Sequence, residues 1–550
     1  MRAALQTRAL ALLVALSAST VSGQQVIATP PQRDQLPVRQ TGSGVIRGRV
    51  IAADTNAPLR RVQIRLTPMG VDGVEVRTTT TGDDGRYEFT QLAAGRYGLK
   101  VSKGGYVDIE YGQRRPFEKG RPIEIADRQV LDRVDMTLPP GAVITGRVTD
   151  ESGEPVARAG VQLARYRYFN GRRQVSGNYS DATDDRGEFR IFGVPPAEYL
   201  LIANFSEPGD RSTDQLRYVP TYYPGTASTA DAQRVQVKLG GELSGLSIAL
   251  VRQRSASVSG VVRSTTPSAF TMVEARRTDG DGSDWHSAVV DPRGGFSLHG
   301  LLPGSYVLEA ETAFGSNERG AIEVKVGATD VVGVVLTMST GASARGQVRF
   351  EGGTPPRDLQ PSQVIVLAGP EDASQGRQMG QMPQPVRSDW TFELTGLHGR
   401  QVLFGAAVRD WGLKAVSVAG NDFTDVPIDF SGGDINGIEV LLSNRHTQVA
   451  GQVSDIRGGV AGDATVVIFS ADPEKWRRGR YIQAARPNQQ GRFQVEGLPA
   501  GRYLAIAFDY LEDGEEQNPD LLKEWVRIAT SFTLADGEKR TLDLKVVNTN

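Results

Sequence analysis

The residues with the greatest potential for chemistry are four histidines: His286, His299, His398 and His446, in a chain of 550 residues that has no cysteine. None of these histidines has a glutamate three residues later, so the His-x-x-Glu ligand pair of a zinc peptidase is missing. The His-Glu-x-x-His motif is missing as well. We therefore predict no metal site of the usual zinc types.

Two pairs of neighbouring acids, Asp83-Asp84 and Asp184-Asp185, are the next candidates. Each pair lies just before a glycine, where a tight turn is expected, and the spaced Asp-x-Asp-x-Asp-Gly loop of a calcium site does not occur. The sequence also lacks a Gly-x-Ser-x-Gly nucleophile motif and a phosphate-binding loop. We predict no catalytic residue, no cofactor and no metal, and hence a protein that is not an enzyme.

Aromatic residues in segments that vary along the chain are the remaining candidates for binding. The residues singled out as ligand or partner contacts are Tyr111, Tyr218, Tyr222, Tyr223, Trp411 and Trp525. Aromatic rings on loops stack on sugars or anchor a protein partner. The alternative interpretation is that these rings fold back and cover the open end of their domain.

The elements that position these residues come from one pattern, which the chain contains five times. Residues 83–101 read DDGRYEFTQLAAGRYGLKV, and related stretches start at Asp184, Asp291, Ser388 and Asn488. An aromatic residue begins each hairpin, an apolar residue follows two positions later, and another follows after five: the aromatics are Tyr87, Phe189, Phe296, Phe392 and Phe493. Alternating apolar positions, a Leu-x-x-Gly turn and a second alternating run predict a β-hairpin. A tyrosine ten residues after the aromatic, missing only from the fourth copy, suggests a tyrosine corner.

Each copy also opens and closes in the same way. A glycine sits inside the opening strand, at positions 48, 146, 260, 346 and 451, and predicts a bulge or a close approach of backbone. Short alternating strands end each copy, and the chain shows no helical period. The predicted fold class is all-β, a tandem array of about five seven-stranded antiparallel β-sandwich domains. We number them units one to five: residues 41–140, 141–254, 255–340, 341–446 and 447–550.

The repeated pattern resembles the carboxypeptidase regulatory-like domain, a transthyretin-like (prealbumin-like) sandwich found behind the catalytic domain of some carboxypeptidases. It is also similar to collagen-adhesin B-type repeats and to starch-binding-like folds. The resemblance extends from about residue 41 to residue 550 and is specific for the fold. It implies binding without catalysis, with carbohydrate as the leading ligand class.

Composition and the first residues indicate export. Residues 1–23 combine Arg2 and Arg8, an apolar core and a small-residue cleavage site, as a signal peptide does, and residues 24–40 form a polar leader expected to be disordered. No later apolar run is long enough to insert into a membrane, and the net charge of −2 argues against nucleic acid. We expect a periplasmic or extracellular monomer that binds a polysaccharide or an envelope protein. A structural spacer or accessory protein of an envelope or nutrient-uptake assembly is the alternative. Short joins between units predict a rod of roughly 170 Å, because a domain of this size has a radius of gyration of about 13 Å.

Overall fold

The structure, a computed structural model, describes residues 42–69, 75–205, 216–264, 271–278, 285–312, 318–357, 359–371, 385–406, 411–488 and 490–547. The predicted signal peptide and leader lie outside the described residues. The described chain is built almost entirely of β-strands, with one seven-residue α-helix, α1 (Pro519–Trp525), which confirms the all-β prediction. This helix is too short to cross a membrane, and no other described helix is long and apolar enough to do so.

The first two units carry strands β1 to β18. Unit one contains β1 (Gly44–Ala52), β2 (Gln63–Met69), β3 (Arg77–Thr80), β4 (Arg86–Leu92), β5 (Gly95–Ser102), β6 (Ile109–Glu110), β7 (Ile123–Ile125), β8 (Val130–Leu131) and β9 (Met136–Leu138). Unit two contains β10 (Ala142–Thr149), β11 (Gly160–Phe169), β12 (Arg172–Ala182), β13 (Glu188–Val194), β14 (Ala197–Asn204), β15 (Leu216–Tyr218), β16 (Thr221–Tyr222), β17 (Val235–Val237) and β18 (Glu242–Ala249). Strand β19 (Arg252–Arg254) follows and pairs with β15.

Units three to five complete the array. Unit three contains β20 (Ala256–Arg263), β21 (Thr271–Arg277), β22 (Trp285–Val289), β23 (Gly295–Leu301), β24 (Gly304–Thr312), β25 (Arg319–Val326) and β26 (Val331–Thr337). Unit four contains β27 (Ala342–Phe350), η1 (Pro361–Gln363), β28 (Ile365–Pro370), β29 (Thr391–Leu397), β30 (Arg400–Ala406), β31 (Gly412–Val418), β32 (Asn421–Asp422), β33 (Ile428–Asp429) and β34 (Ile435–Ser443). Unit five contains β35 (Gln448–Ser454), β36 (Thr465–Ser470), η3 (Pro473–Arg477), η4 (Gly479–Tyr481), β37 (Ile482–Ala485), β38 (Arg492–Glu496), β39 (Gly501–Phe508), η5 (Glu515–Gln517), α1, β40 (Thr530–Leu534), β41 (Lys539–Thr541) and β42 (Leu544–Val547).

The opening strand of every unit lies between the first hairpin strand and the closing strand of the same unit. In unit two, for example, β10 pairs antiparallel with β13 and parallel with β18. The sheet that contains the opening strand is therefore mixed, which corrects the prediction of an antiparallel sandwich, whereas the other sheet of unit two has only antiparallel pairs. The parallel pair places the start and the end of each unit at opposite poles of its sandwich.

The repeated glycine of the opening strand lies opposite the repeated aromatic of the hairpin in all five units, as in the pairs Gly48–Tyr87, Gly146–Phe189 and Gly451–Phe493. A Cβ atom at Gly48 would lie 1.9 Å from the carbonyl oxygen of Val134, on the segment that leads to the closing strand. The other four glycines face a carbonyl oxygen at 1.9 to 2.1 Å in the same way. The predicted close approach of backbone is confirmed at every copy.

The predicted tyrosine corners are also present. The hydroxyls of Tyr97, Tyr199 and Tyr503 donate to the carbonyl oxygens four residues earlier, at 2.9, 2.9 and 2.8 Å. These rings are among the most buried side chains of their units, and each unit has a core cluster of its own. In units one to four the core lies between two sheets, and in unit five the strands join into one eight-stranded sheet. The repeated pattern therefore specifies the core of each sandwich.

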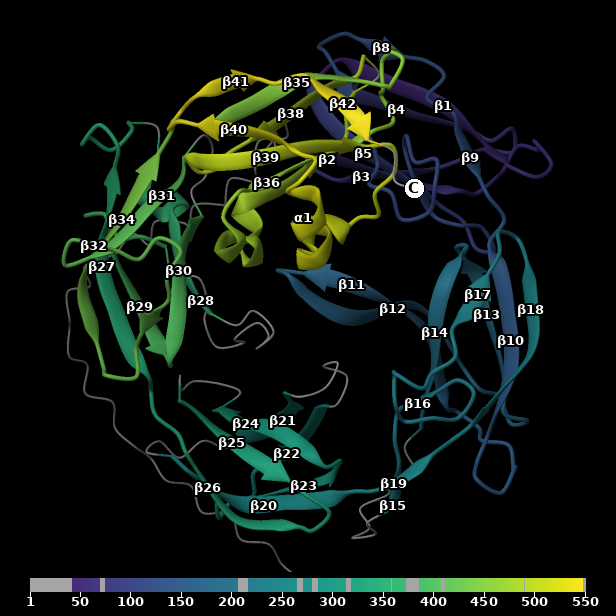
Figure 1. Cartoon of the computed structure of the whole chain (residues 1–550), viewed down its shortest axis with the longest axis vertical. Coiled ribbons are helices and arrows are strands. Elements are labelled where there is room, and N and C mark those ends of the chain that lie inside the picture. Colours follow the sequence, from purple (N-terminus) through teal and green to yellow (C-terminus); the bar gives the residue numbers. More distant parts are fainter. Residues whose placement is uncertain are drawn as a thin grey trace, which may run out of the picture.

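The five units form a closed ring instead of the predicted rod (Figure 1). The poles of each unit do lie at opposite ends, but successive units turn in the same sense, and unit five returns to contact units one and two. The prediction failed because short joins limit bending without fixing the angle at which one unit follows the next. In the ring, the β11–β12 hairpin extends inward toward α1 of unit five (Figure 1).

Candidate functional site

The three tyrosines predicted as contacts in unit two face their own domain. Tyr222 is only 4% exposed and packs against Ala164, Leu200 and Ile202, and Tyr223 packs against the core of the unit. The hydroxyl of Tyr218 donates to the Glu151 carboxylate at 2.9 Å, and its ring lies under the Arg252 guanidinium. Tyr222 is thus buried in its own domain, as the alternative interpretation of these rings expects, and its role as a contact stays a prediction.

The other three candidates are packed as well. Trp525 is 6% exposed in a second core of unit five, where its ring centroid lies 4.6 Å from that of Phe508. Trp411 meets Phe350 edge to face at 5.1 Å in unit four, and Tyr111 packs against the core of unit one. The six residues come from four units and form no common surface, because each covers part of its own sandwich.

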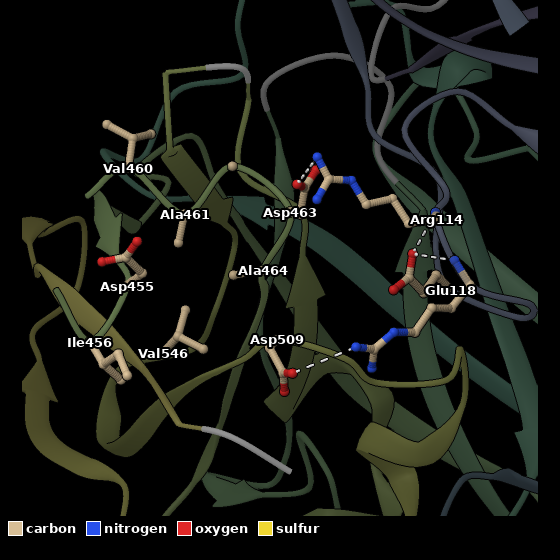
Figure 2. Close-up of a pocket in the computed structure, with 12 residues that line it drawn as sticks. Arg114, Glu118, Asp455, Ile456, Val460, Ala461, Asp463, Ala464, Asp509 and Val546 are labelled. Atoms are coloured by element: carbon tan, nitrogen blue, oxygen red, sulfur yellow. Dashed lines mark hydrogen bonds and ion pairs between the residues drawn. The ribbon is translucent and has the colours of Figure 1, made fainter. Parts of the chain in front are cut away.

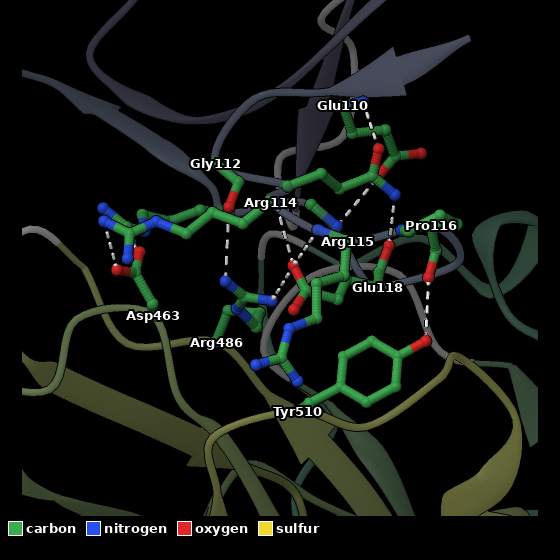
Figure 3. Close-up of polar contacts among 12 residues, drawn as sticks. Glu110, Gly112, Arg114, Arg115, Pro116, Glu118, Asp463, Arg486 and Tyr510 are labelled. Carbon is green, nitrogen blue, oxygen red and sulfur yellow. Dashed lines mark hydrogen bonds and ion pairs between the residues drawn. The ribbon is translucent and has the colours of Figure 1, made fainter. Parts of the chain in front are cut away.

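The structure instead assembles polar side chains where unit five meets unit one. We call residues 110–121 of unit one, which run from the last residue of β6 toward β7, the docking segment. Its conformation is fixed locally by Gln113, whose side chain accepts from the Glu110 amide at 2.6 Å, and by Glu118, whose carboxylate accepts from two amides. These bonds hold the backbone in a tight loop that directs its basic side chains toward unit five (Figure 3).

Three arginines of the docking segment meet acids of unit five. Arg114 lies 2.6 Å from Asp463, and Arg121 binds the same carboxylate and also donates to the carbonyl oxygen of Gly462 at 2.7 Å. Arg115 lies 3.9 Å from Asp509, with its guanidinium over an aromatic ring of unit five. Arg121 is the most enclosed of the three, with 11% of its side chain exposed, so its pair is the least screened by solvent.

In one further ion pair of this junction, the arginine belongs to unit five and the acid belongs to unit one. This pair is fully buried. Arg486 of unit five lies 3.4 Å from the carboxylate of Glu118, and the two side chains are 1% and 3% exposed. Arg486 also donates to the carbonyl oxygen of Gly112 at 3.3 Å (Figure 3). Burial lowers the pKa of the Arg486 guanidinium, and the Glu118 carboxylate partly offsets this effect. A buried pair of this kind destabilises the structure strongly if one partner is removed.

Backbone contacts complete the junction. The Asp513 amide donates to the carbonyl oxygen of Phe117 at 2.8 Å, and the Tyr510 hydroxyl donates to that of Pro116 at 3.1 Å. Glu118 and Glu512 form an isolated antiparallel bridge. Burial and the nearby Glu512 carboxylate raise the pKa of the Tyr510 hydroxyl, so this phenol stays protonated and keeps donating.

The β11–β12 hairpin brings unit two to the same place. Arg165 lies 2.6 Å from Glu512, and its guanidinium stacks 3.9 Å from the ring centre of Phe117 in the docking segment. At the tip of the hairpin, the Asn170 amide donates to the Gln517 side chain of unit five at 2.7 Å. Units one, two and five therefore meet at one polar junction.

A pocket of about 310 Å³ opens beside this junction (Figure 2). Its walls are the ion pairs of Arg114 and Arg115 with unit five, and its apolar side is formed by Ile456, Val460 and Val546. Among the described residues, no group of three or more His, Asp or Glu side chains could hold a metal ion. The arrangement suits binding and assembly.

The junction was not predicted from the sequence, although the charges of two inserts point to it. The first copy carries GQRRPFEKGR and the fifth carries DYLEDGEEQNPD, and these two inserts have opposite charge. The opposite charges of the two inserts were the sequence signal from which contact between units one and five could have been predicted. The buried Glu118–Arg486 pair has no comparable signal, because Arg486 lies in an ordinary strand-end sequence.

The comparisons with known proteins agree with the fold of the first two units. The model of the carboxypeptidase regulatory-like domain matches twice, at residues 45–139 and 143–249. Both matches fall in the first two units, which confirms the resemblance seen in the sequence. No curated protein matches the chain.

Several solved structures match parts of the chain at low identity. The minor pilin GBS52 of Streptococcus agalactiae is 16% identical over 38% of this chain and 95% of its own, with a TM-score of 0.21. The full-length pilus protein RrgB of Streptococcus pneumoniae is 8% identical over 74% of this chain and 98% of its own, with a TM-score of 0.16. The Bacillus anthracis TIE protein is 12% identical over 71% and 69%, with a TM-score of 0.15. TM-scores this low support no conclusion about function.

Proposed function

We propose that this chain is an exported, non-catalytic scaffold protein whose five sandwich units act together as a ring in an envelope assembly. The observation that supports the proposal most strongly concerns the segments that vary between units, because these segments make the contacts between units. In units one, two and five those segments bind one another and close the ring. Residues 1–23 have the pattern of a signal peptide and support export.

Carbohydrate binding, the ligand class first expected from the family resemblance, has less support. A sugar platform needs aromatic faces open to solvent. Tyr222 and Trp525 are buried, and the walls of the pocket beside the junction carry no aromatic side chain. We therefore favour the alternative of a structural or accessory protein whose partner is an envelope protein.

The test compares the mature chain with a variant whose ring is opened. Arg165→Glu with Lys119→Glu reverses two charges that face acids of unit five. Arg345→Glu, in an ion pair that lies wholly within unit four, is the matched control. Each protein is cross-linked to native envelope in parallel with a glycan-array screen.

We expect a defined envelope protein to be captured by the mature chain and by the control, and to be lost with the opened variant. We expect no glycan signal. Saturable glycan binding that survives ring opening would replace the scaffold function with carbohydrate binding by single units.

A further inference from the structure

Unit three has an edge strand that the other units do not have. In units one and two the corresponding edge is divided into two short strands, β6 and β7 or β16 and β17, with an insertion between them. In unit three the same position is taken by β25, which runs for eight residues along β24 without a break. Short and interrupted edges prevent pairing with other chains, whereas a long straight edge permits it. The outer backbone groups of Arg319 already pair with Ser339, so a second strand can pair with β25 only beyond Arg319.

The side chains of β25 are open to solvent. Ala321, Ile322, Glu323 and Lys325 are exposed, and Ile322 is 37% exposed on the side of the strand that faces the seam between the sheets. Among the described residues, Glu323 and Lys325 have no ion-pair partner. The two sheets of unit three lie one outside the other around the ring (Figure 1), so their edges open toward the broad faces of the ring.

The charges along β25 select what can pair with it. When two copies of the strand pair antiparallel, residues on one face must lie opposite residues on the same face, which leaves only a few registers. Pairing centred on Ile322 places Arg319 opposite Lys325 twice, and pairing centred on Glu323 places two glutamates together. Like charges directly opposite each other destabilise a sheet.

Pairing centred on Val324 has the opposite result. It places Glu323 of each copy opposite Lys325 of the other, sets the two Val324 side chains together, and brings Ile322 opposite Val326. A lysine on an edge normally discourages pairing. Here Lys325 has an opposite charge, Glu323, two residues earlier on the same strand. The strand can therefore pair with a second copy of itself without placing like charges together.

We propose that β25 is the contact surface for a second copy of this chain, which binds by antiparallel β25–β25 pairing centred on Val324. The four-stranded sheet of unit three in one copy would then join the same sheet of the other copy. Together they would form one continuous eight-stranded sheet across a two-fold axis. The isologous geometry uses the same patch on both copies, as homodimers usually do. This replaces the expectation of a monomer.

The experiment is sedimentation velocity on the full mature chain over a wide concentration range. We expect a concentration-dependent dimer for the wild type. Glu323→Lys and Lys325→Glu each place like charges opposite each other in the dimer, and each should weaken association by tenfold or more. The double variant Glu323→Lys/Lys325→Glu restores opposite charges and should dimerise like the wild type. Glu439→Lys, on the outer sheet of unit four, is the control and should leave association unchanged.

All of these side chains are exposed, so equal melting temperatures will show that the variants are folded. A wild type that stays monomeric at the highest concentration would overturn the proposal. A dimer that is indifferent to the single reversals, or a double variant that is not rescued, would overturn it too. Binding of a different extended peptide to β25, without self-association, would also count against a second copy as the occupant.

Discussion

At the residue scale, the repeated glycine of each opening strand lets the backbone of the closing strand, or of the segment just before it, come very close. The carbonyl oxygen of Val134 occupies the space where a Cβ atom of Gly48 would be, and the ring of Tyr87 lies beside it. Backbone cannot move away as a flexible side chain can, so the site has no room for a methyl group. The glycine and the aromatic opposite it act as one cross-strand pair.

Gly48→Ala should therefore destabilise unit one by about 3 kcal/mol, as overpacking of a core does at its upper range. Gly104→Ala is the matched control in the same unit, because nothing lies within 4 Å of its Cβ position. Calorimetry of the full chain should show one transition shifted to lower temperature for Gly48→Ala only. Equal melting profiles for the two variants would contradict the close-approach argument.

Tyr222 gives a second prediction at this scale. Because the ring is buried against Ala164, Leu200 and Ile202, Tyr222→Ala should cost about 3 to 5 kcal/mol, as the loss of a buried aromatic does. Phe192→Ala removes a ring that is 52% exposed in the same unit and should cost little. Unfolding by denaturant measures the free energy of unfolding of both variants. A Tyr222→Ala protein as stable as the wild type would contradict burial of this ring and would favour a role as a surface contact.

Glu515 predicts a pH dependence. Burial, together with the Glu512 carboxylate, raises the pKa of Glu515 above its ordinary value of 4.5. A raised pKa in the folded state means that the stability from this group is fully present below pH 4.5 and is lost as the pH rises through the raised value. Glu515→Gln should thus be more stable than the wild type at pH 7 and similar to it at pH 4. The opposite order at pH 7 would show that the charged form is favoured in the folded protein.

At the element scale, the inserts differ from the repeated hairpins in what could be predicted. The hairpins follow from local pattern, because alternation, turn residues and the tyrosine corner all act within about 20 residues. The surface against which an insert packs depends on residues that are distant in the sequence. The docking segment has a locally fixed conformation, but its contacts are with Asp463, Arg486 and Asp513, more than 300 residues later in the sequence.

The aromatic inserts were open to two interpretations for the same reason. A tyrosine between prolines, as at Tyr222 and Tyr223, has the same local sequence whether it faces solvent or the back of its own sheet. The structure places Tyr222 on the sheet, beside β14. Whether the ring faces solvent or the sheet depends on which part of the sheet the rest of unit two leaves uncovered. The local sequence around the tyrosines does not contain that information.

The docking segment supplies the prediction at this scale. Glu118→Ala leaves Arg486 buried without its carboxylate, which should cost about 3 to 5 kcal/mol at the junction. Replacing both residues with methionine removes both charges and should cost much less. Proteolysis or hydrogen exchange of residues 110–121 measures opening of the junction. Equal protection in Glu118→Ala and the wild type would contradict a stabilising role for this pair.

At the scale of the whole molecule, the five units of one chain form a closed ring (Figure 1). Five units with similar poles and joins turn in the same sense, and the contacts among units one, two and five close the circle (Figure 1). Most ion pairs of the junction are partly exposed, so salt should weaken them, whereas the Glu118–Arg486 pair is shielded from solvent. Closure is the feature on which the proposed scaffold function depends.

Small-angle X-ray scattering of the mature chain tests closure most directly. A ring of five units should have a maximum dimension of roughly half the approximately 170 Å of an end-to-end rod of domains this size. Arg165→Glu with Lys119→Glu should lengthen the distribution of interatomic distances, and Arg345→Glu should leave it unchanged. We predict the short maximum dimension and a distribution without a long tail for the wild type. A tail that extends to the full length of the rod would contradict the closed ring.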